Sequence, residues 1–410
     1  MNRAIIFLLL FTFVGCGTNN ISPLGEDYFI KFYGAEGYQQ GVSVQSTPDG
    51  GFIIGGNSIP VFGGSSDYLL IKTDAFGNQE WLQTYDFEGT GGNDLLTDVL
   101  VEDNSYVIAG TSAINGVDKM VLLRIDVDGT LLNSSIIFPL ANNSFKTNGI
   151  SPLSAGGYLI TGPIVAGDPS QTGKSLISVV NSDFSIADSL SFPSVAPSVG
   201  NETVFVKGLE VINHFDPAGT ETNNYLIFGY VNSDQGPKLN IFQFRESLGS
   251  AITTPTAIDY NNSIITDVLQ ISNNAYKMLA STDNETYMIN VTESPSVQAY
   301  TLGSDQILKS EKFAQGVGFK GVSFTLTGGN DFVIASNTMP EKSTITSSTI
   351  VESSPAGTIN WGRVFGTEIS YTSGKVITLG NGAVVYTGTA GFKGQDKVFL
   401  IKLKSNGEMK

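Results

Sequence analysis

The 410-residue sequence has little of the chemistry that most enzyme and metal sites require. It contains one cysteine, Cys16, and one histidine, His214, and charged residues make up only 15% of the chain. A single cysteine excludes an intramolecular disulfide. A single histidine leaves one candidate histidine ligand for a zinc site and one candidate base for a Ser-His-Asp triad. We interpret His214, which is followed closely by Asp216-Pro217, as an exposed loop residue.

Positive charge is also scarce. Lys and Arg number 22 against 38 Asp and Glu, so the formal net charge is −16, and no basic cluster offsets it. A surface of this sign repels nucleic-acid phosphates and anionic lipid head groups. We therefore expect no nucleic-acid binding, and we expect membrane association only through a lipid anchor.

The apolar segment at the N-terminus is too short to cross a membrane. Residues 4–14 follow one positive residue, Arg3, and eleven residues cannot span about 30 Å of hydrocarbon. This pattern predicts a signal peptide over residues 1–15. The Gly15-Cys16 junction resembles a bacterial lipobox, which implies cleavage before Cys16 and acylation of its thiol. Several acyl chains would hold the protein firmly, because each buried CH₂ contributes about 0.8 kcal/mol.

The residues after the cysteine indicate the destination of the protein. By the same resemblance, Gly17 in place of aspartate implies export to the outer membrane. The residues that follow Gly17 are neutral, which leaves the choice between the cell surface and the periplasmic face open. We expect a lipidated tether over residues 16–26 and a folded domain over residues 27–410.

A short phrase then repeats seven times along the chain. Each copy has an aromatic or aliphatic residue, two or three apolar residues and then a small residue, and the copies start 51 to 67 residues apart. This spacing is close to the period of propeller and solenoid arrays. The copies begin at Phe52, Tyr106, Tyr158, Tyr225, Tyr276, Phe332 and Val384.

Apolar-polar alternation and turn residues predict four antiparallel strands in each repeat, which is the composition of a propeller blade. In the seventh repeat the chain ends before the fourth strand. The segment Tyr28–Gly34, just before the first repeat, looks like the fourth strands of other repeats. We therefore predict an all-β, seven-bladed β-propeller of four-stranded antiparallel blades, closed by an N-terminal strand that completes the last blade.

Segments 49–56, 67–74 and 77–81 resemble the repeat unit of bacterial β-propeller lipoproteins of mostly unassigned role. The resemblance implies a propeller fold and a place in the cell envelope, and it implies no catalytic residues. The hairpin that ends at Trp81 is also similar to the tryptophan motif of quinoprotein-type propellers. Only Trp81 and Trp361 keep the aromatic residue, and we expect no quinone or other cofactor.

Candidate chemistry should lie on the propeller axis, where the innermost strands converge. The residue that precedes the apolar part of these strands is mostly glycine, which supplies little chemistry. Asp98 and Asp267 are the acidic exceptions, and three blades apart they would lie almost opposite each other. They are either a carboxylate pair for glycoside hydrolysis or cation binding, or two solvated aspartates at the channel mouth. We favour the solvated interpretation and assign no catalytic or metal-binding residue. The aligned positions are Gly41, Asp98, Gly149, Gly208, Asp267, Gly321 and Lys375.

Two further segments have simple interpretations. Asp126–Gly129 begins like a calcium loop but lacks the later glutamate, so we interpret it as a hairpin turn. The longest spacing, between the third and fourth repeats, includes the loops Ser194–Asn201 and Phe215–Glu221. These loops are either a recognition surface or tolerated insertions.

Together these features favour a non-enzymatic outer-membrane lipoprotein that serves as a protein-interaction scaffold, or as an accessory subunit of an outer-membrane assembly or secretion complex. The expected partner is an outer-membrane protein or a secretion or assembly component. The alternative is a propeller that binds or cleaves a carbohydrate, with the glycan held in the central funnel near Asp98 and Asp267.

Overall fold

The computed structural model describes most of the chain that follows the N-terminal segment. This part contains β-strands and one short 3-10 helix, η1 (Phe87–Gly89). None of the helices in it is long and apolar enough to cross a membrane. The described residues are 28–89, 91–137, 143–167, 173–192, 202–211, 224–245, 256–258, 262–272, 275–282, 285–294, 299–308, 318–339 and 344–409.

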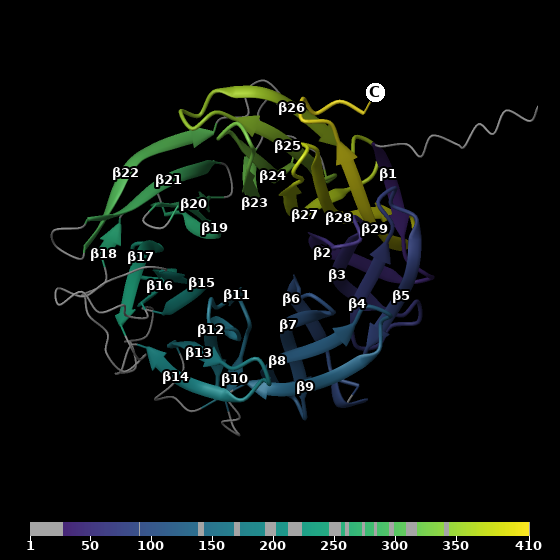
Figure 1. The fold of residues 1–410 in the computed structure, drawn as a ribbon, viewed down its shortest axis with the longest axis horizontal. Helices are drawn as coiled ribbons and strands as arrows, with labels where there is room; N and C mark the ends of the chain where they lie inside the picture. The colour runs from purple at the N-terminus through teal and green to yellow at the C-terminus, as the bar shows by residue number, and fades with distance from the viewer. Residues whose placement is uncertain are drawn as a thin grey trace, which may run out of the picture.

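The strands form a ring of antiparallel sheets around a central axis (Figure 1). One sheet has eight strands, but only a single parallel pair, Tyr38 with Asp396, joins its two halves. Divided at this pair, the described strands make seven units, which we number in chain order. The architecture confirms the prediction of an all-β propeller built from four-stranded antiparallel blades.

Each unit runs from an innermost strand at the axis to an outermost strand at the rim. Unit 1 consists of β2 (Tyr38–Ser46), β3 (Phe52–Ile59), β4 (Asp67–Thr73) and β5 (Gln79–Tyr85). Unit 2 consists of β6 (Asp94–Val101), β7 (Ser105–Ile114), β8 (Val117–Asp126) and β9 (Leu131–Ile137). Unit 3 consists of β10 (Ser144–Phe145) with β11 (Gly149–Pro152), β12 (Tyr158–Ala166), β13 (Ser175–Val180) and β14 (Ile186–Phe192).

The remaining units have the same order. Unit 4 consists of β15 (Thr203–Val211), β16 (Asn224–Val231), β17 (Lys238–Arg245) and β18 (Thr256–Ile258), and unit 5 of β19 (Ile264–Ser272), β20 (Ala275–Ser281), β21 (Thr286–Ser294) and β22 (Ala299–Leu308). Unit 6 consists of β23 (Gly318–Leu326), β24 (Phe332–Met339), β25 (Ser347–Ser353) and β26 (Ile359–Phe365). Unit 7 consists of β27 (Tyr371–Thr378), β28 (Val384–Phe392), β29 (Gln395–Leu403) and β1 (Phe29–Tyr33).

The N-terminal strand closes the ring, as the sequence predicted. β1 pairs antiparallel with β29, from Phe29 opposite Lys402 to Tyr33 opposite Val398. It occupies the outermost place of unit 7, where the C-terminal part of the chain supplies the other three strands. Closure by this strand covers an edge of β29 that would otherwise be open to pairing with another chain.

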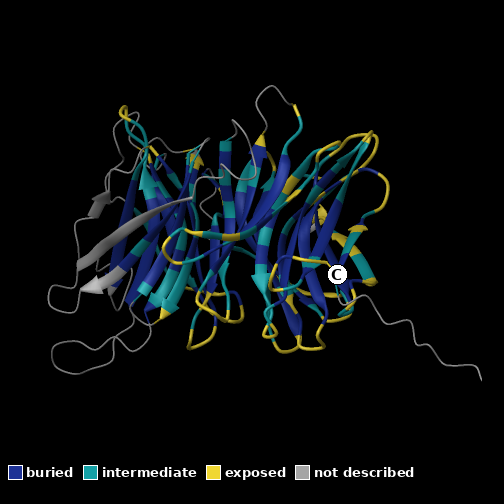
Figure 2. Ribbon diagram, turned by 90° about the horizontal axis from the view of Figure 1, so that it is seen from above, coloured by how far each residue is buried: buried dark blue, intermediate teal, exposed yellow. Residues whose placement is uncertain are grey.

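The repeated phrase forms the second strand of each unit. In β3, all residues of Phe52–Asn57 are buried. Neighbouring units pack on both faces of a blade, so a second strand has no solvent side and its apolar residues run continuously. Between units 1 and 2, for example, Tyr68 packs in one cluster with Val99 and Tyr106. Buried residues fill the blades in Figure 2, and the exposed residues gather at the two faces of the ring.

Both tryptophans link their own unit to the next one. Nε1 of Trp81 in β5 donates a hydrogen bond to the carbonyl of Val127 in the unit 2 hairpin, at 3.0 Å. Nε1 of Trp361 in β26 donates in the same way to Ser405 in the unit 7 hairpin, at 3.0 Å. A side chain at Gly407 would overlap the Trp361 ring, so this hairpin requires glycine.

The closing strand makes the equivalent link from unit 7 to unit 1. The Phe29 ring takes the place of the tryptophan and fills the space where a side chain at Gly77 would lie. The Tyr33 hydroxyl donates a hydrogen bond to the Gly77 carbonyl at 2.7 Å, and Tyr85 does the same to Gly129 at 2.8 Å. β1 is therefore bonded to one blade and packed on the next.

The two faces of the ring differ in their connections. The turn face carries the hairpins between the first and second strands and between the third and fourth strands, such as residues 47–51 and 74–78. The loop face carries the connections between the second and third strands and between successive units, such as residues 60–66. β1 begins at the turn face, because Phe29 lies opposite Lys402, next to the hairpin at residues 404–408.

Candidate functional site

The innermost strands bring Asp98 and Asp267 to the axis. The pairing register shifts between Leu96 and Asp98 in β6 and between Ile265 and Asp267 in β19. The same irregularity occurs in β2, β15, β23 and β27. A β-bulge inserts one extra residue, bends the strand and re-aims its side chains. The repeated bulge therefore directs the side chains of the innermost strands toward the centre of the ring.

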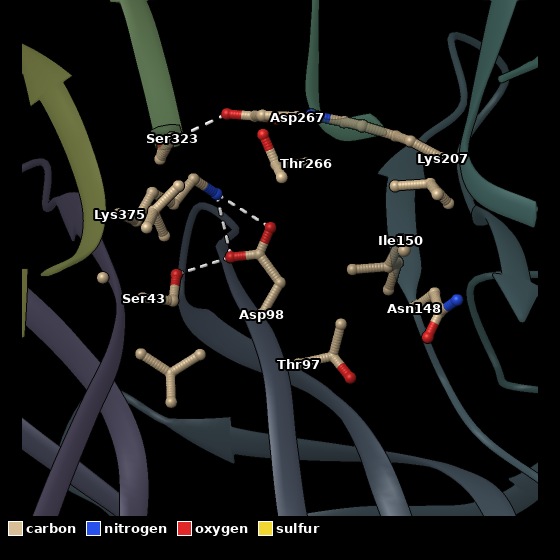
Figure 3. A pocket seen from close by; sticks show the side chains of 15 residues that line it. Ser43, Thr97, Asp98, Asn148, Ile150, Lys207, Thr266, Asp267, Ser323 and Lys375 are labelled. Atoms are coloured by element: carbon tan, nitrogen blue, oxygen red, sulfur yellow. Dashed lines mark hydrogen bonds and ion pairs between the residues drawn. The ribbon is translucent and has the colours of Figure 1, made fainter. Parts of the chain in front are cut away.

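These side chains line an axial cavity of about 190 Å³ (Figure 3). All seven units contribute to it, and both candidate aspartates lie on its wall. The lining residues are Val42, Ser43, Thr97, Asp98, Asn148, Gly149, Ile150, Val206, Lys207, Thr266, Asp267, Val322, Ser323, Gly374 and Lys375.

Asp98 is held by two neighbouring side chains. Nζ of Lys375, from unit 7, donates to both carboxylate oxygens of Asp98 at 2.8 Å. The Ser43 hydroxyl, from unit 1, donates to Oδ1 at 2.5 Å. Only 17% of the Asp98 side chain and 24% of the Lys375 side chain are exposed. The pair is therefore largely shielded from water.

Asp267 has a similar arrangement with different blades. Nζ of Lys207, from unit 4, lies 3.4 Å from Oδ1 and also donates to the Val268 carbonyl at 2.9 Å. The Ser323 hydroxyl and the Phe324 amide, from unit 6, donate to Oδ2 at 3.1 and 3.2 Å. The interpretation of the two aspartates as solvated is thus wrong, because each one is ion-paired and mostly buried.

The environment of Asp98 favours its ionised form. Burial acts to raise the pKa of Asp98, but the Lys375 ammonium, the Ser43 hydrogen bond and the more distant charge of Lys207 hold the pKa below its ordinary value. A carboxyl with a lowered pKa is a poor general acid at neutral pH. Asp98 can accept hydrogen bonds from a ligand, but it is not arranged to donate a proton.

Three residues that contact the two aspartates were missed by sequence reasoning: Ser43, Lys207 and Ser323. Lys207 was passed over in favour of Gly208, because the bulge adds a residue that a simple alignment of the strands cannot detect. Lys375 was aligned correctly, but nothing in the sequence paired it with Asp98. A signal was present, since a basic residue at an axial position of a chain with so few positive charges needs an acidic partner.

The described residues also contain one group of carboxylates close enough together to hold a metal ion. Asp67, Asp86 and Asp94 have oxygens within 4.8 Å of one another. They lie at the loop face between units 1 and 2, away from the axial cavity, since Asp67 begins β4 and Asp94 begins β6. Their spacing in the sequence matches no metal motif, so sequence reasoning did not find them.

Asp94 is expected to make stability depend on pH. Burial raises the pKa of Asp94 to about 6. The charges of Asp86 and Asp67 add to this shift, and hydrogen bonds from Phe87 and Ser112 oppose it. Between about pH 4 and 6 the folded protein keeps a proton that the unfolded chain has released, so stability falls as the pH rises through this range.

The substitution Asp94→Asn removes this penalty and keeps an acceptor for the Phe87 amide. We expect it to raise the free energy of unfolding by about 1–2 kcal/mol at pH 7.5 and to change it little at pH 4. Urea denaturation at the two pH values measures the difference, with the exposed Asp103→Asn as a control. A gain of equal size at both pH values would contradict the assignment.

Several sequence expectations lie outside the described residues. Cys16, His214 and the loops Ser194–Asn201 and Phe215–Glu221 belong to this group. The expectation for Asp126–Gly129 agrees with the structure, because the Asp128 and Thr130 amides donate to the Asp126 side chain at 3.0 and 2.7 Å in a tight hairpin. The turn uses this carboxylate for its own backbone.

Comparisons with known proteins bear on the fold. No protein-family model and no curated protein matches the chain. The solved structure of YCF48 from Cyanidioschyzon merolae is similar over 91% of this chain and 98% of its own, with 11% identity and a TM-score of 0.50. The likeness supports a propeller fold and nothing more specific. The Dos1 propeller also matches, over 89% of this chain and 94% of its own, with 8% identity and a TM-score of 0.46.

Proposed function

We propose that this protein is a non-enzymatic outer-membrane lipoprotein that acts as a protein-interaction scaffold or as an accessory subunit of an assembly or secretion complex. The observation that carries the proposal is a group of exposed apolar side chains on the loop face of units 1 and 2. Phe62 is fully exposed (101%), and Tyr38, Val61 and Leu95 are exposed as well. We call these four residues the loop-face patch.

The four residues lie on neighbouring strands and loops of the loop face. Tyr38 lies opposite Ile59 in the β2–β3 pair, two residues before Val61. The amide after Leu95 donates to the Asn57 side chain at 2.8 Å, which ties the start of β6 to the end of β3. Exposed apolar side chains that gather on one face of a folded domain are typical of protein–protein contact sites. An outer-membrane protein or an assembly component is the partner that the proposed anchor makes available.

The course of the N-terminal strand is consistent with an anchored scaffold. Residues 17–28 between Cys16 and β1 would reach about 40 Å if fully extended. Because β1 begins at the turn face, the tether from an acylated Cys16 would enter the folded domain at this face. The loop-face patch lies on the opposite face, so the tether would leave it open to a partner.

Removing the patch is expected to release the partner. In a pull-down from detergent-solubilised envelopes, the wild-type protein should recover one outer-membrane component in near-equal amount. The double variant Val61→Ser, Phe62→Ser should recover at least about tenfold less, because apolar anchors dominate such interfaces. Phe76→Ser, on a turn-face residue that is 42% exposed, is the matched control and should recover as much as the wild type. Equal recovery by all three proteins would contradict the proposal.

A second candidate is a propeller that binds a carbohydrate in the axial cavity. Asp98 and Asp267 favour it, because both offer acceptor oxygens inside a concave polar site. The same geometry disfavours cleavage, since a glycosidase needs one carboxyl that is protonated at the working pH. Both carboxylates face a lysine here. Glycan turnover that disappears in Asp98→Asn would contradict this preference for binding.

A further inference from the structure

The axial cavity is the inner part of a longer funnel. A second hollow of about 470 Å³ shares four lining residues with it: Asp98, Ile150, Lys207 and Lys375. The additional lining residues of this outer part lie toward the ends of β6, β11, β15 and β19. Those strand ends lie at the turn face, so the funnel opens there.

The floor of the funnel is neutral but strongly polar. It contains two ammonium groups, on Lys207 and Lys375, and two carboxylates, on Asp98 and Asp267. These four side chains are between 17% and 25% exposed. A ligand with a net charge would leave one charge without a partner in this shielded site, which is costly. A ligand with no net charge, or with one charge of each sign, avoids that cost.

The paired side chains keep some bonding capacity for a ligand. An ammonium group has three N–H donors. Lys375 donates two of them to Asp98. Lys207 donates one to Asp267 and one to the Val268 carbonyl. Each lysine therefore has one donor left, and each carboxylate keeps acceptor lone pairs. The floor can bind a negative group and a positive group at the same time.

The outer part of the funnel is aliphatic. Its walls include Leu100, Leu153, Leu209 and Leu269, one from each of four successive units, and each is half-buried. Glu210 at the rim accepts a hydrogen bond from the Ser154 amide at 2.6 Å. None of the described residues that line either part is aromatic. The flat C–H face of a sugar ring packs best on an aromatic ring, so these walls suit a branched alkyl group better.

We propose that the funnel binds the zwitterion of an aliphatic α-amino acid. The ligand carboxylate receives the remaining N–H donors of Lys375 and Lys207, and the ligand ammonium lies against Asp98 and Asp267. The alkyl side chain extends toward the turn face among the four leucines. This site is independent of the loop-face patch, so each can fail without the other.

Calorimetric titration of the purified propeller with leucine tests the ligand class. We expect leucine to bind, and we expect isocaproate and isopentylamine to bind at least about tenfold more weakly, because each lacks one of the two charges. Glucose should bind more weakly than leucine. Equal binding of leucine and either singly charged analogue, tighter binding of glucose, or no binding of any of the four compounds would overturn the proposal.

Variants test the placement of the ligand. Lys207→Met and Asp267→Asn should each weaken leucine binding at least about tenfold. The double variant, which removes both charges of the pair, should weaken it by at least the same factor. The double variant guards against misfolding, because it leaves no unpaired charge in the floor. Lys393→Met, on an exposed loop, is the matched control and should bind like the wild type. Unchanged binding by a folded double variant would place the ligand elsewhere.

Discussion

Replacing Phe29 with alanine is expected to lower the free energy of unfolding by about 3–5 kcal/mol. Phe29 is 1% exposed and belongs to the core between units 7 and 1. Its ring packs over Gly77, so the truncation leaves a cavity at the junction where the ring closes. Equilibrium denaturation in urea, followed by circular dichroism, measures the loss.

Phe32 provides the control on the same strand. Its side chain is 43% exposed and contacts Tyr371 and Phe392 edge to face at the rim. Phe32→Ala should therefore cost only about 1 kcal/mol. If the two alanine variants lose the same stability, or if Phe29→Ala loses almost none, β1 is not the strand that closes the propeller in solution.

The second large effect concerns the anchor. Replacing Cys16 with serine is expected to move the protein from the membrane fraction to the soluble fraction, because serine cannot take up the acyl chains that hold the protein. An uncleaved precursor would itself stay in the membrane. In the serine variant, residues 1–15 are therefore replaced by an ordinary secretory signal peptide, and this variant is compared with the wild type. Cell fractionation and immunoblotting should give at least about a tenfold change in the membrane-bound share.

The folded domain serves as the internal control for this experiment. Cys16 precedes β1, so the serine variant should unfold at the same temperature as the lipidated protein in detergent. If the serine variant with the secretory signal peptide still fractionates with the outer membrane, the lipid anchor is contradicted. That result would indicate that the propeller itself binds the membrane.

The fold could be predicted because its strongest signal is local. The second strand of each blade is buried on both sides, which gives a continuous apolar run, and the turns that flank it favour glycine and aspartate. The closing strand was also predictable, because Tyr28–Gly34 has the pattern of the other outermost strands and the seventh unit lacks one. Both inferences use patterns within short segments, although the closing strand pairs with a strand at the other end of the chain.

The site could be predicted only in part, because its contacts join different blades whose residues lie far apart in the sequence. Asp98 was found, but its partner Lys375 lies 277 residues away. Lys207 was missed because a bulge changes the register by one residue, and a strand alignment without the bulge selects Gly208. The carboxylates of Asp67 and Asp94 meet across two blades, which no short motif records.

Photo-crosslinking in living cells tests whether this propeller is a scaffold with a defined partner. A photoreactive phenylalanine analogue is placed at position 62 on the loop-face patch and, in a matched strain, at position 76 on the turn face. We expect position 62 to give one dominant adduct with a single envelope protein, and we expect none at position 76. Adducts of equal yield and mixed identity at both positions, or none at position 62, would contradict the claim that this propeller is a scaffold with a defined partner.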